Sequence, residues 1–528
     1  MNPFARGRSG ILFTPCGGPA PTGFVAGCIL VCWLVVATFA GEQLLEISPY
    51  FRGEPLRIGN EVQLLGDDYV IEDRWKLTRE VGSVIKHLGN PVLVQDKPWE
   101  GQIGMISSVF YDEKLQKFRM YYDSFNLTNY FNPRVGAPSY AVAYAESDDG
   151  FTWNKPHLEG FPYGEYPRTN IINHGLNGKR AGAARVFLNP DQSDPAKRFM
   201  IVYLSGGVRL AYSADGLHWD TLPEALLRYH SDSANQLLYV PELKLWYLYV
   251  RPFVRSNGRG DLPEGPRHTS RRLALMTSPD LKTWSPPRIV FYPDERDEPD
   301  YNSVSVFRRH GLFIAMYFQM TQEHGQSEQE TYLATSRDGI HWQRTEDRKP
   351  FLPRGLPGSF DHGEVGVIMS PPIEIGDEMY LYYGGSPEGE NSFFKESAVG
   401  VSRFRKDRFI GQRAGDMTGY LLTKEFVLEG TKLVLNCSSL SRLYRAREQD
   451  GIRVAIFQSP DYRQSGQAIQ EMPILGCTLE DCDLVTTDST AHTVTWKGKS
   501  DLSALKGKSV YLRFQMRVAT LYSFQIAP

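Results

Sequence analysis

The sequence predicts an all-β protein in which a five-bladed β-propeller is followed by a small antiparallel β-sandwich. Two observations carry this prediction: a turn motif that recurs five times between residues 147 and 407, and short alternating strands that fill the intervals. The composition agrees, because 28 Tyr, 28 Phe, 48 Gly and 34 Pro suit short strands and turns better than long helices. The length of 528 residues allows two or three domains.

The charge balance excludes one broad class of partner. Lys and Arg number 58 against 61 Asp and Glu, which gives a formal net charge of −3, and no basic stripe stands out. This argues against a nucleic-acid binder whose affinity comes from phosphate contacts. With 41% hydrophobic and 23% charged residues, the chain can bury real cores and is not disordered.

The first 40 residues have the pattern of a secretory signal peptide. Arg6 and Arg8 precede an apolar run over residues 23–40, which ends in Thr38-Phe39-Ala40 with small residues at its first and last positions. An uncleaved membrane anchor is the alternative, because 18 apolar residues lie at the short end of a membrane span. We therefore expect a secreted or periplasmic protein, anchored by residues 23–40 only if the leader is retained.

The repeat that sets the architecture is a seven-residue turn motif containing Ser, Asp, Gly and Trp. Its four clear copies are Ser147–Trp153, Ser213–Trp219, Ser278–Trp284, which has Leu281 in place of the Gly, and Ser336–Trp342, and a degenerate copy covers residues 402–407. Their serines are 66, 65, 58 and 66 residues apart, about one four-stranded unit with long loops. We expect the Asp to accept backbone N–H bonds, Gly to adopt the left-handed conformation and Trp to pack on the sheet. Because they recur in every unit, we interpret the Asp and Trp as structural rather than catalytic.

Each unit also has an earlier pair of strands, of which the first is apolar and the second aromatic. The pairs are Ser107–Tyr111 with Phe118–Tyr122, Ala183–Leu188 with Phe199–Leu204, Leu237–Val240 with Trp246–Val250, Val304–Phe307 with Leu312–Phe318, and Val365–Ser370 with Glu378–Tyr383. Radial repetition of such antiparallel sheets buries the blade faces without long exposed edges, which favours a propeller. Residues 62–78 are a candidate for an N-terminal strand that completes the last blade.

The pattern changes after Gly415, where the repeat ends. Residues 416–528 alternate as short strands separated by turns such as Lys497-Gly498-Lys499, which is typical of a small β-sandwich. The predicted parts are therefore a leader at 1–40, a propeller at 41–415 and a sandwich at 416–528, the last a separable module with a supporting or sugar-binding role. The cysteines outside the leader match no spaced zinc signature, and we expect no metal and no cofactor.

The candidate functional residues stand just before the first strand of each blade, because the innermost strands of a propeller begin together at one mouth of its channel. Unlike the motif Asp, they differ from blade to blade. They are Trp99 and Glu100, Arg180 and Arg185, Asp232 and Asn235, Asp300, Tyr301 and Asn302, and Asp361, His362 and Glu364, with Arg251 at the end of a strand. Converging carboxylates beside arginines and aromatic walls are what cleavage of a glycosidic bond requires.

These features resemble the clan of five-bladed propeller glycosidases that includes arabinanases, xylosidases, invertases and levansucrases (glycoside hydrolase families 43, 32 and 68). Within that clan the chain is most similar to a family-32-like group of exported bacterial proteins common in planctomycetes, over about residues 60–526. The resemblance is carried by Asp232-Ser233-Ala234-Asn235, Asp300-Tyr301-Asn302, Tyr249-Val250-Arg251, the run 376–385, and the runs 505–514 and 519–524. It implies two Asp and one Glu at blade starts, although the first blade has Glu100 where the clan usually has Asp.

The leading hypothesis is an exported glycoside hydrolase that acts on a poly- or oligosaccharide. We expect Glu364 to be the general acid, because desolvation and nearby acids would favour its protonated form. Asp232 or Asp300 would act as nucleophile or as base for water, Arg251 would keep one of these carboxylates ionised, and Glu100 is held in reserve. The residues expected to bind substrate are Trp99, Arg180, Arg185, Asn235, Arg251, Tyr301, Asn302, Asp361 and His362.

Two other functions compete with hydrolysis of this kind. A non-catalytic carbohydrate-binding propeller would use Trp99, Tyr301 and other aromatic residues as sugar platforms without needing carboxyl groups of different acidity. A sialidase-like hydrolase shares Ser, Asp, Gly and Trp in its turn motif. In the sialidase motif one residue separates Asp from Gly, whereas here they are adjacent, and five copies rather than six also disfavour it.

Overall fold

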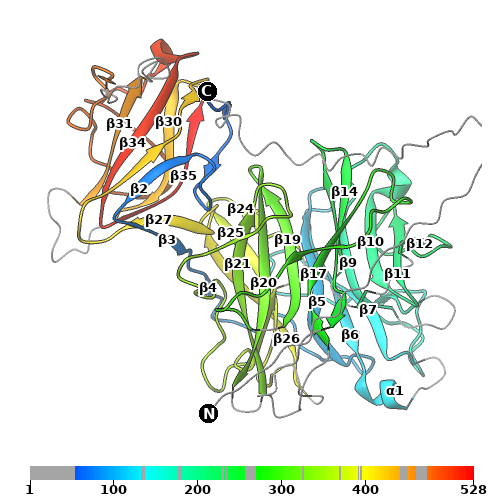
Figure 1. The fold of residues 1–528 in the computed structure, drawn as a ribbon. Helices are drawn as coiled ribbons and strands as arrows, with labels where there is room; N and C mark the ends of the chain where they lie inside the picture. The colour runs from blue at the N-terminus through cyan, green and yellow to red at the C-terminus, as the bar shows by residue number, and fades with distance from the viewer. Residues whose placement is uncertain are drawn as a thin grey trace, which may run out of the picture. The chain divides into compact units, whose positions relative to one another are not determined.

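The computed structural model describes residues 54–132, 137–175, 181–227, 231–232, 235–255, 269–298, 300–323, 326–367, 370–389, 392, 395–439, 450–458 and 472–528. Their regular structure is almost entirely β (Figure 1), with one short α-helix, α1 (Leu127–Phe131), and 3₁₀ turns at Pro195–Lys197 and Ser503–Leu505. The predicted all-β class is therefore confirmed. No helix in these ranges is long and apolar enough to cross a membrane. The predicted leader and its cleavage site lie outside the described residues.

The first three repeat units each form a four-stranded antiparallel sheet. The first unit consists of β5 (Gln102–Asp112), β6 (Lys117–Phe125), β7 (Tyr140–Ser147) and β8 (Ile171–Asn173). The second consists of β9 (Gly182–Leu188), β10 (Phe199–Leu204), β11 (Val208–Ser213) and β12 (Asp220–Thr221). The third consists of β13 (Gln236–Val240), β14 (Leu245–Val250), β17 (Leu273–Ser278) and β18 (Arg288–Phe291). A separate hairpin, β15 (Phe253–Arg255) with β16 (Thr269–Arg271), lies between β14 and β17 in the chain.

The fourth and fifth units are joined into one larger sheet. The fourth consists of β19 (Tyr301–Arg309), β20 (Leu312–Glu323), β21 (Gln326–Ser336) and β22 (Gln343–Arg344). The fifth consists of β23 (Glu364–Val367), β24 (Ile373–Ile375), β25 (Glu378–Ser386), β26 (Ala398–Arg405) and β4 (Ile85–Lys86). They meet at one parallel pair, Gln329 with Glu364. The N-terminal strand of the last unit is thus β4, and the expectation for residues 62–78 is wrong.

Side chains tie the first strands of neighbouring units together. The contacts are Ser108 Oγ accepting from the Val186 N–H (3.0 Å), Gln236 Oε1 accepting from the Val306 N–H (2.5 Å), and Ser370 Oγ accepting from the Val109 N–H (3.0 Å). They join the first unit to the second, the third to the fourth, and the fifth back to the first. Closure of this kind is what a propeller requires. A count of five blades stays a prediction.

The repeated turn is built as the sequence predicts. Asp149 Oδ1 accepts the N–H groups of Phe151 and Thr152, both at 2.7 Å, and Gly150 has φ of +80°. Partial burial alone would raise the pKa of Asp149, but the backbone donors of Thr152 and Phe151 lower it to about 2. Trp153 closes the turn, because its Nε1–H donates to the Gly150 carbonyl at 3.2 Å. The motif Asp is therefore an acceptor that holds a turn.

The second part of the fold is a sandwich of two antiparallel sheets. One contains β1 (Gln63–Leu64), β3 (Leu77–Val81), β27 (Ile410–Ala414), β30 (Lys432–Ser438), β33 (Asp488–Thr493) and β35 (Ala519–Ala527). The other contains β2 (Ile71–Trp75), β28 (Gly419–Thr423), β29 (Phe426–Val427), β31 (Gly451–Gln458), β32 (Met472–Pro473) and β34 (Ser509–Arg517). Leu512 and Phe514 of one sheet pack with Leu435 and Phe524 of the other in a shared buried core.

The sandwich recruits strands from before the first repeat unit. β3 pairs with β27, which pairs with β35, and β2 pairs with β28. A boundary after residue 415 therefore separates strands that pair, and the sandwich is not the separable C-terminal module that the sequence suggested. The physical reason is edge protection: without β2 and β3, the strands β28 and β27 would present unpaired backbone groups.

Candidate active site

Two of the predicted acids are joined by a continuous chain of polar side chains. Arg251 forms an ion pair with Asp232, and its Nη1 lies 2.8 Å from Oδ1 of Asn302. The amide nitrogen of Asn302 donates to Gln329 Oε1 at 3.0 Å, and that of Gln329 donates to Glu364 Oε2 at 3.0 Å. The chain passes from the third unit through the fourth to the fifth. It links two carboxylates 132 positions apart in the sequence.

The third predicted acid, Asp300, joins the same assembly through Arg271. Asp300 Oδ1 accepts the N–H of Arg271 at 3.0 Å, and Nη1 of Arg271 lies 3.4 Å from Oδ1 of Asn302. Asn302 thus receives both guanidinium groups, Arg251 on one side and Arg271 on the other. We refer to Asp232, Arg251, Arg271, Asp300, Asn302, Gln329, Glu364 and Lys395 together as the acid network.

The three acids differ in their access to solvent. The side chain of Asp232 is 37% exposed, whereas Asp300 is 5% and Glu364 1% exposed. Arg251, which holds Asp232, is itself buried. Asp232 is therefore the acid of the three that a ligand in solvent can reach most readily.

The surroundings of Glu364 differ from the expectation. Its Oε1 lies 2.8 Å from Nζ of Lys395, and both groups are almost completely buried. The Lys395 ammonium and the Gln329 amide both contact this carboxylate. Because the ion pair joins opposite charges, it favours the ionised form of Glu364, whereas the expected role as general acid needs the protonated form. Within the described ranges, no three His, Cys, Asp or Glu side chains are grouped as metal ligands.

Local hydrogen bonds hold Asp232 where Arg251 can reach it. The N–H of Asp232 donates to the Arg251 carbonyl at 3.3 Å, and the N–H of Arg251 donates to Ser231 Oγ at 3.0 Å. Ser231 in turn donates to Asn235 Oδ1 at 2.6 Å, while the Asn235 amide donates to the Asp232 carbonyl at 2.8 Å. Asn235, which the sequence suggested as a substrate ligand, is buried and braces this loop instead.

Glu100 does not belong to the acid network. Its carboxylate lies 2.8 Å from Nζ of Lys155 and accepts the Tyr122 hydroxyl at 2.6 Å and the N–H groups of Asp96 and Lys97 at 3.0 and 3.1 Å. Glu100 is 4% exposed. These contacts all lie within the first unit and its approach, so Glu100 is a buried structural acid, and its reserve role as a catalytic residue is not supported.

The two aromatic residues expected at the mouth are core residues. Trp99 is buried and its Nε1–H donates to Asn170 Oδ1 at 2.7 Å. Tyr301 is buried within the fourth unit, where its hydroxyl donates to Asp297 at 2.8 Å and accepts from Arg344 at 2.8 Å. Neither ring presents a face to a sugar in this structure, so their expected role as platforms is wrong.

The remaining predicted residues of the fifth unit also serve the fold. Asp361 is buried and binds Lys86 Nζ at 2.5 Å and the Tyr383 hydroxyl at 2.9 Å. Burial and the Asp361 carboxylate raise the pKa of Tyr383. His362 is half-buried, with Nδ1 3.3 Å from the Gly355 carbonyl. Arg185 lies between first strands with Nη2 3.5 Å from the Val304 carbonyl. Arg180 lies outside the described residues.

One unusual acid escaped the sequence analysis. Asp123, on β6, is 6% exposed and accepts the N–H groups of Ala183 at 2.5 Å and Ala184 at 3.3 Å. Burial raises its pKa to about 7, although both backbone donors lower it. The left-handed Ala183, with φ of +53°, aims two successive N–H groups at this carboxylate. A lone acid at the end of the apolar run Met120-Tyr121-Tyr122 was the available signal.

Comparisons with known proteins give distant likenesses only. No protein-family profile and no curated protein matches the chain. An N-acetylgalactosamine deacetylase from F. plautii, solved with blood group B trisaccharide, is 15% identical, with a TM-score of 0.40, over 63% of this chain and 97% of the other. A glycosyl hydrolase from Bacteroides ovatus is 12% identical, with a TM-score of 0.41, over 61% and 94%. A GH62 hydrolase in complex with xylotriose is 12% identical, with a TM-score of 0.39, over 62% and 97%. Because these TM-scores are below 0.5, we base the function on the geometry of the acid network.

Proposed function

We propose that this protein is an exported glycoside hydrolase that cleaves glycosidic bonds of a poly- or oligosaccharide at the acid network. The observation that supports the proposal most is that one hydrogen-bonded network joins Asp232, Asp300 and Glu364. Each comes from the start of a different repeat unit, and Arg251, Arg271, Asn302 and Gln329 connect them. Glycosidic cleavage needs two carboxyl groups held on opposite sides of the scissile bond.

Asp232 is the proposed nucleophile, or the base that activates water. Its side chain is the most exposed of the three acids, so a sugar can reach it. Its ion pair with Arg251 suits a group that reacts as a carboxylate. Because Arg251 is itself fixed by Asn302, the carboxylate is held in place before the substrate arrives.

The proton donor is proposed to be Asp300, with Glu364, whose ion pair with Lys395 suits an ionised group, as the partner that orients the sugar. Lys395 and Gln329 position the Glu364 carboxylate, one on each oxygen. The roles of proton donor and nucleophile can be told apart by comparing substrates with different leaving groups. A variant that lacks the general acid should keep activity on nitrophenyl glycosides, whose leaving group needs no proton, and lose it on natural linkages. A variant that lacks the nucleophile should lose both activities.

The test is a reducing-sugar screen of the purified chain across polysaccharides, followed by Asp232→Asn, Asp300→Asn and Glu364→Gln on the best substrate. These changes keep volume and remove charge. We expect each to lower turnover by about 100-fold or more with folding intact. Wild-type rates in all three variants would refute the assignment. Saturable sugar binding without turnover by the wild-type chain would instead identify a carbohydrate-binding propeller.

Export is the second part of the proposal and depends on the leader alone. The basic start, apolar run and small residues before Gly41 support cleavage between Ala40 and Gly41. N-terminal sequencing of the processed protein should give Gly41. Finding Met1 on soluble protein from the cytoplasm would contradict export.

A further inference from the structure

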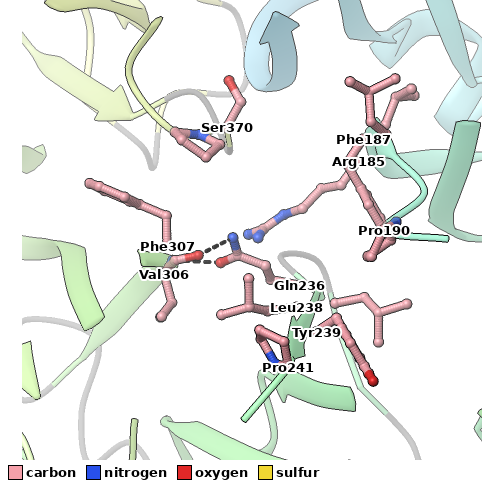
Figure 2. Close-up of a pocket in the computed structure, with 14 residues that line it drawn as sticks. Arg185, Phe187, Pro190, Gln236, Leu238, Tyr239, Pro241, Val306, Phe307 and Ser370 are labelled. Atoms are coloured by element: carbon pink, nitrogen blue, oxygen red, sulfur yellow. Dashed lines mark hydrogen bonds between the residues drawn. The ribbon is translucent and has the colours of Figure 1, made fainter. Parts of the chain in front are cut away.

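A cavity of about 440 Å³ lies among the first strands, apart from the acid network. Figure 2 shows its lining residues, which come from β9, β13, β19 and the segment after β23 and include no member of the network. Both sites use β19: the network uses Asn302 near its beginning, and the cavity uses Val306 and Phe307. Arg185 of the cavity also reaches the Val304 carbonyl, with its Nη2 at 3.5 Å. The cavity counts as a second site because its lining shares no residue with the network, and its volume is in the range of small-molecule pockets.

The walls of this cavity are apolar with three polar exceptions. Val, Leu, Phe, Tyr and Pro side chains make up most of the lining, and the polar members are Arg185, Gln236 and Ser370. Gln236 exchanges hydrogen bonds with the backbone of Val306, and Ser370 Oγ accepts the N–H of Val109. The lining residues include no Asp or Glu. Arg185 is consequently the group that gives the cavity its charge.

The guanidinium of Arg185 occupies the middle of this apolar site. Arg185 is 2% exposed, and in Figure 2 its side chain extends from β9 across the cavity toward Gln236. Burial lowers the pKa of Arg185 well below its usual value, which disfavours the charged form, and a bound anion would offset this cost. Among apolar walls a cation attracts an anion strongly, because little water is present to screen the charge. Charge complementarity therefore favours an anionic ligand.

We propose that the cavity binds a small organic monoanion, a carboxylate on an aromatic or aliphatic body. The carboxylate would bind the Arg185 guanidinium, a pairing that gives strong charge-assisted hydrogen bonds. The body would pack on the apolar wall formed by residues such as Leu238 and Phe307. One guanidinium calls for one negative charge, and the apolar wall disfavours a free sugar. Leu188, the last residue of β9, is part of the lining and is 44% exposed.

The test is calorimetric titration of the full chain with 4-phenylbutyrate and with its neutral analogue, 4-phenylbutyramide. The acid should bind at one site, and the amide at least about tenfold more weakly, since a lost charge-assisted bond costs about 1.4 kcal/mol or more. Leu188→Trp places a larger side chain in the lining and should weaken binding of the acid about tenfold. Leu115→Trp is the matched control, because Leu115 is 53% exposed in the turn after β5, outside the cavity.

Arg185→Met should erase the preference for the acid over the amide. If this buried substitution prevents folding, the comparison of Leu188→Trp with Leu115→Trp decides the proposal. Asp232→Asn should leave binding of the acid unchanged, because Asp232 belongs to the acid network. Equal binding of acid and amide, absence of binding at millimolar concentrations, or equal binding by the two Trp variants would overturn the proposal. So would loss of binding in Asp232→Asn.

Discussion

The acids of the repeated turn and the acids at the starts of the repeat units differ in what they contact. Asp149, Asp215 and Asp338 occupy equivalent positions in their units, and each accepts backbone N–H groups two and three residues further on. Asp232 and Glu364 instead contact side chains from other strands and share a network across three units. A repeated acid stabilises a repeated turn. An acid that occurs in one unit only is a candidate for a catalytic role.

Asp149 and Asp123 show that local donors alone do not decide the state of a carboxyl group. Both accept two backbone N–H groups. In the open turn these bonds outweigh burial, and the pKa of Asp149 is about 2. Between β6 and β9 burial outweighs them, and the pKa of Asp123 is about 7. The two acids differ in solvent access, and Asp149 also accepts from the hydroxyl groups of Ser147 and Thr152, which lower its pKa further.

The largest effect on stability should come from Glu100, the blade-start acid outside the network. Glu100→Ala removes the buried carboxylate from Lys155, leaves the more exposed Asp96 on the same ammonium, and removes the acceptor of Tyr122, which should cost about 3 kcal/mol or more. Thermal unfolding measures this loss. Glu113→Ala, at an exposed acid of the same unit, is the control and should change little. A stable Glu100→Ala variant would mean that the first unit does not depend on this pair.

Asp123 should make stability depend on pH with an unusual sign. Its folded pKa of about 7 exceeds the unfolded value of 3.8, so the folded state binds more protons between these limits. Its contribution is present below about pH 4 and is lost as pH rises through about 7, by up to roughly 4 kcal/mol.

Melting temperatures of wild type and Asp123→Asn at about pH 4.5 and about pH 8 measure this dependence. The melting temperature of Asp123→Asn should rise relative to that of wild type as the pH increases. Asp149→Asn is the matched control: the folded pKa of about 2 lies below the unfolded 3.8, so its contribution is lost only below about pH 4. A difference in melting temperature between Asp123→Asn and wild type that does not change with pH would contradict the raised pKa of Asp123.

The sequence identified the fold class, the turn motif and the three acids of the network because each leaves a local pattern. The motif recurs, and the acids directly precede apolar strands. Lys395, Gln329 and Arg271 left no pattern, since only the folded chain brings them to Glu364 and Asn302. Glu100 shared the pattern of the catalytic candidates, and it differs from them because the contacts described above, with Lys155, Tyr122 and the N–H groups of Asp96 and Lys97, lie within the first unit and its approach.

The predicted boundary of the sandwich after residue 415 was wrong for a related reason. β2 and β3 pair with strands more than 300 residues away, and strand pairing over that distance has no signature in one sequence. The burial of Trp99 and Tyr301 was equally hidden, because an aromatic residue at a strand end suits a core as well as a sugar site.

A smaller effect should come from the repeated turn. Asp149→Ala removes the acceptor for two backbone donors and should cost about 1–2 kcal/mol, as loss of a helix cap does. Asp148→Ala, next to it and 84% exposed, should stay within about 0.5 kcal/mol of wild type. Calorimetric melting of the two variants gives the comparison. Equal melting temperatures would show that the turn does not need its Asp.

The most direct test of the central claim compares two isosteric changes, one in each class of acid. Asp232→Asn and Asp215→Asn are assayed for kcat/KM on the best polysaccharide substrate, with folding checked by thermal melting. Asp232→Asn should lower kcat/KM by about 100-fold or more, because it removes the charge that attacks the sugar or activates water. Asp215→Asn should keep kcat/KM within about twofold and affect only stability. Wild-type kcat/KM in Asp232→Asn, or an equal loss in both variants, would contradict the assignment of chemistry to the acid network.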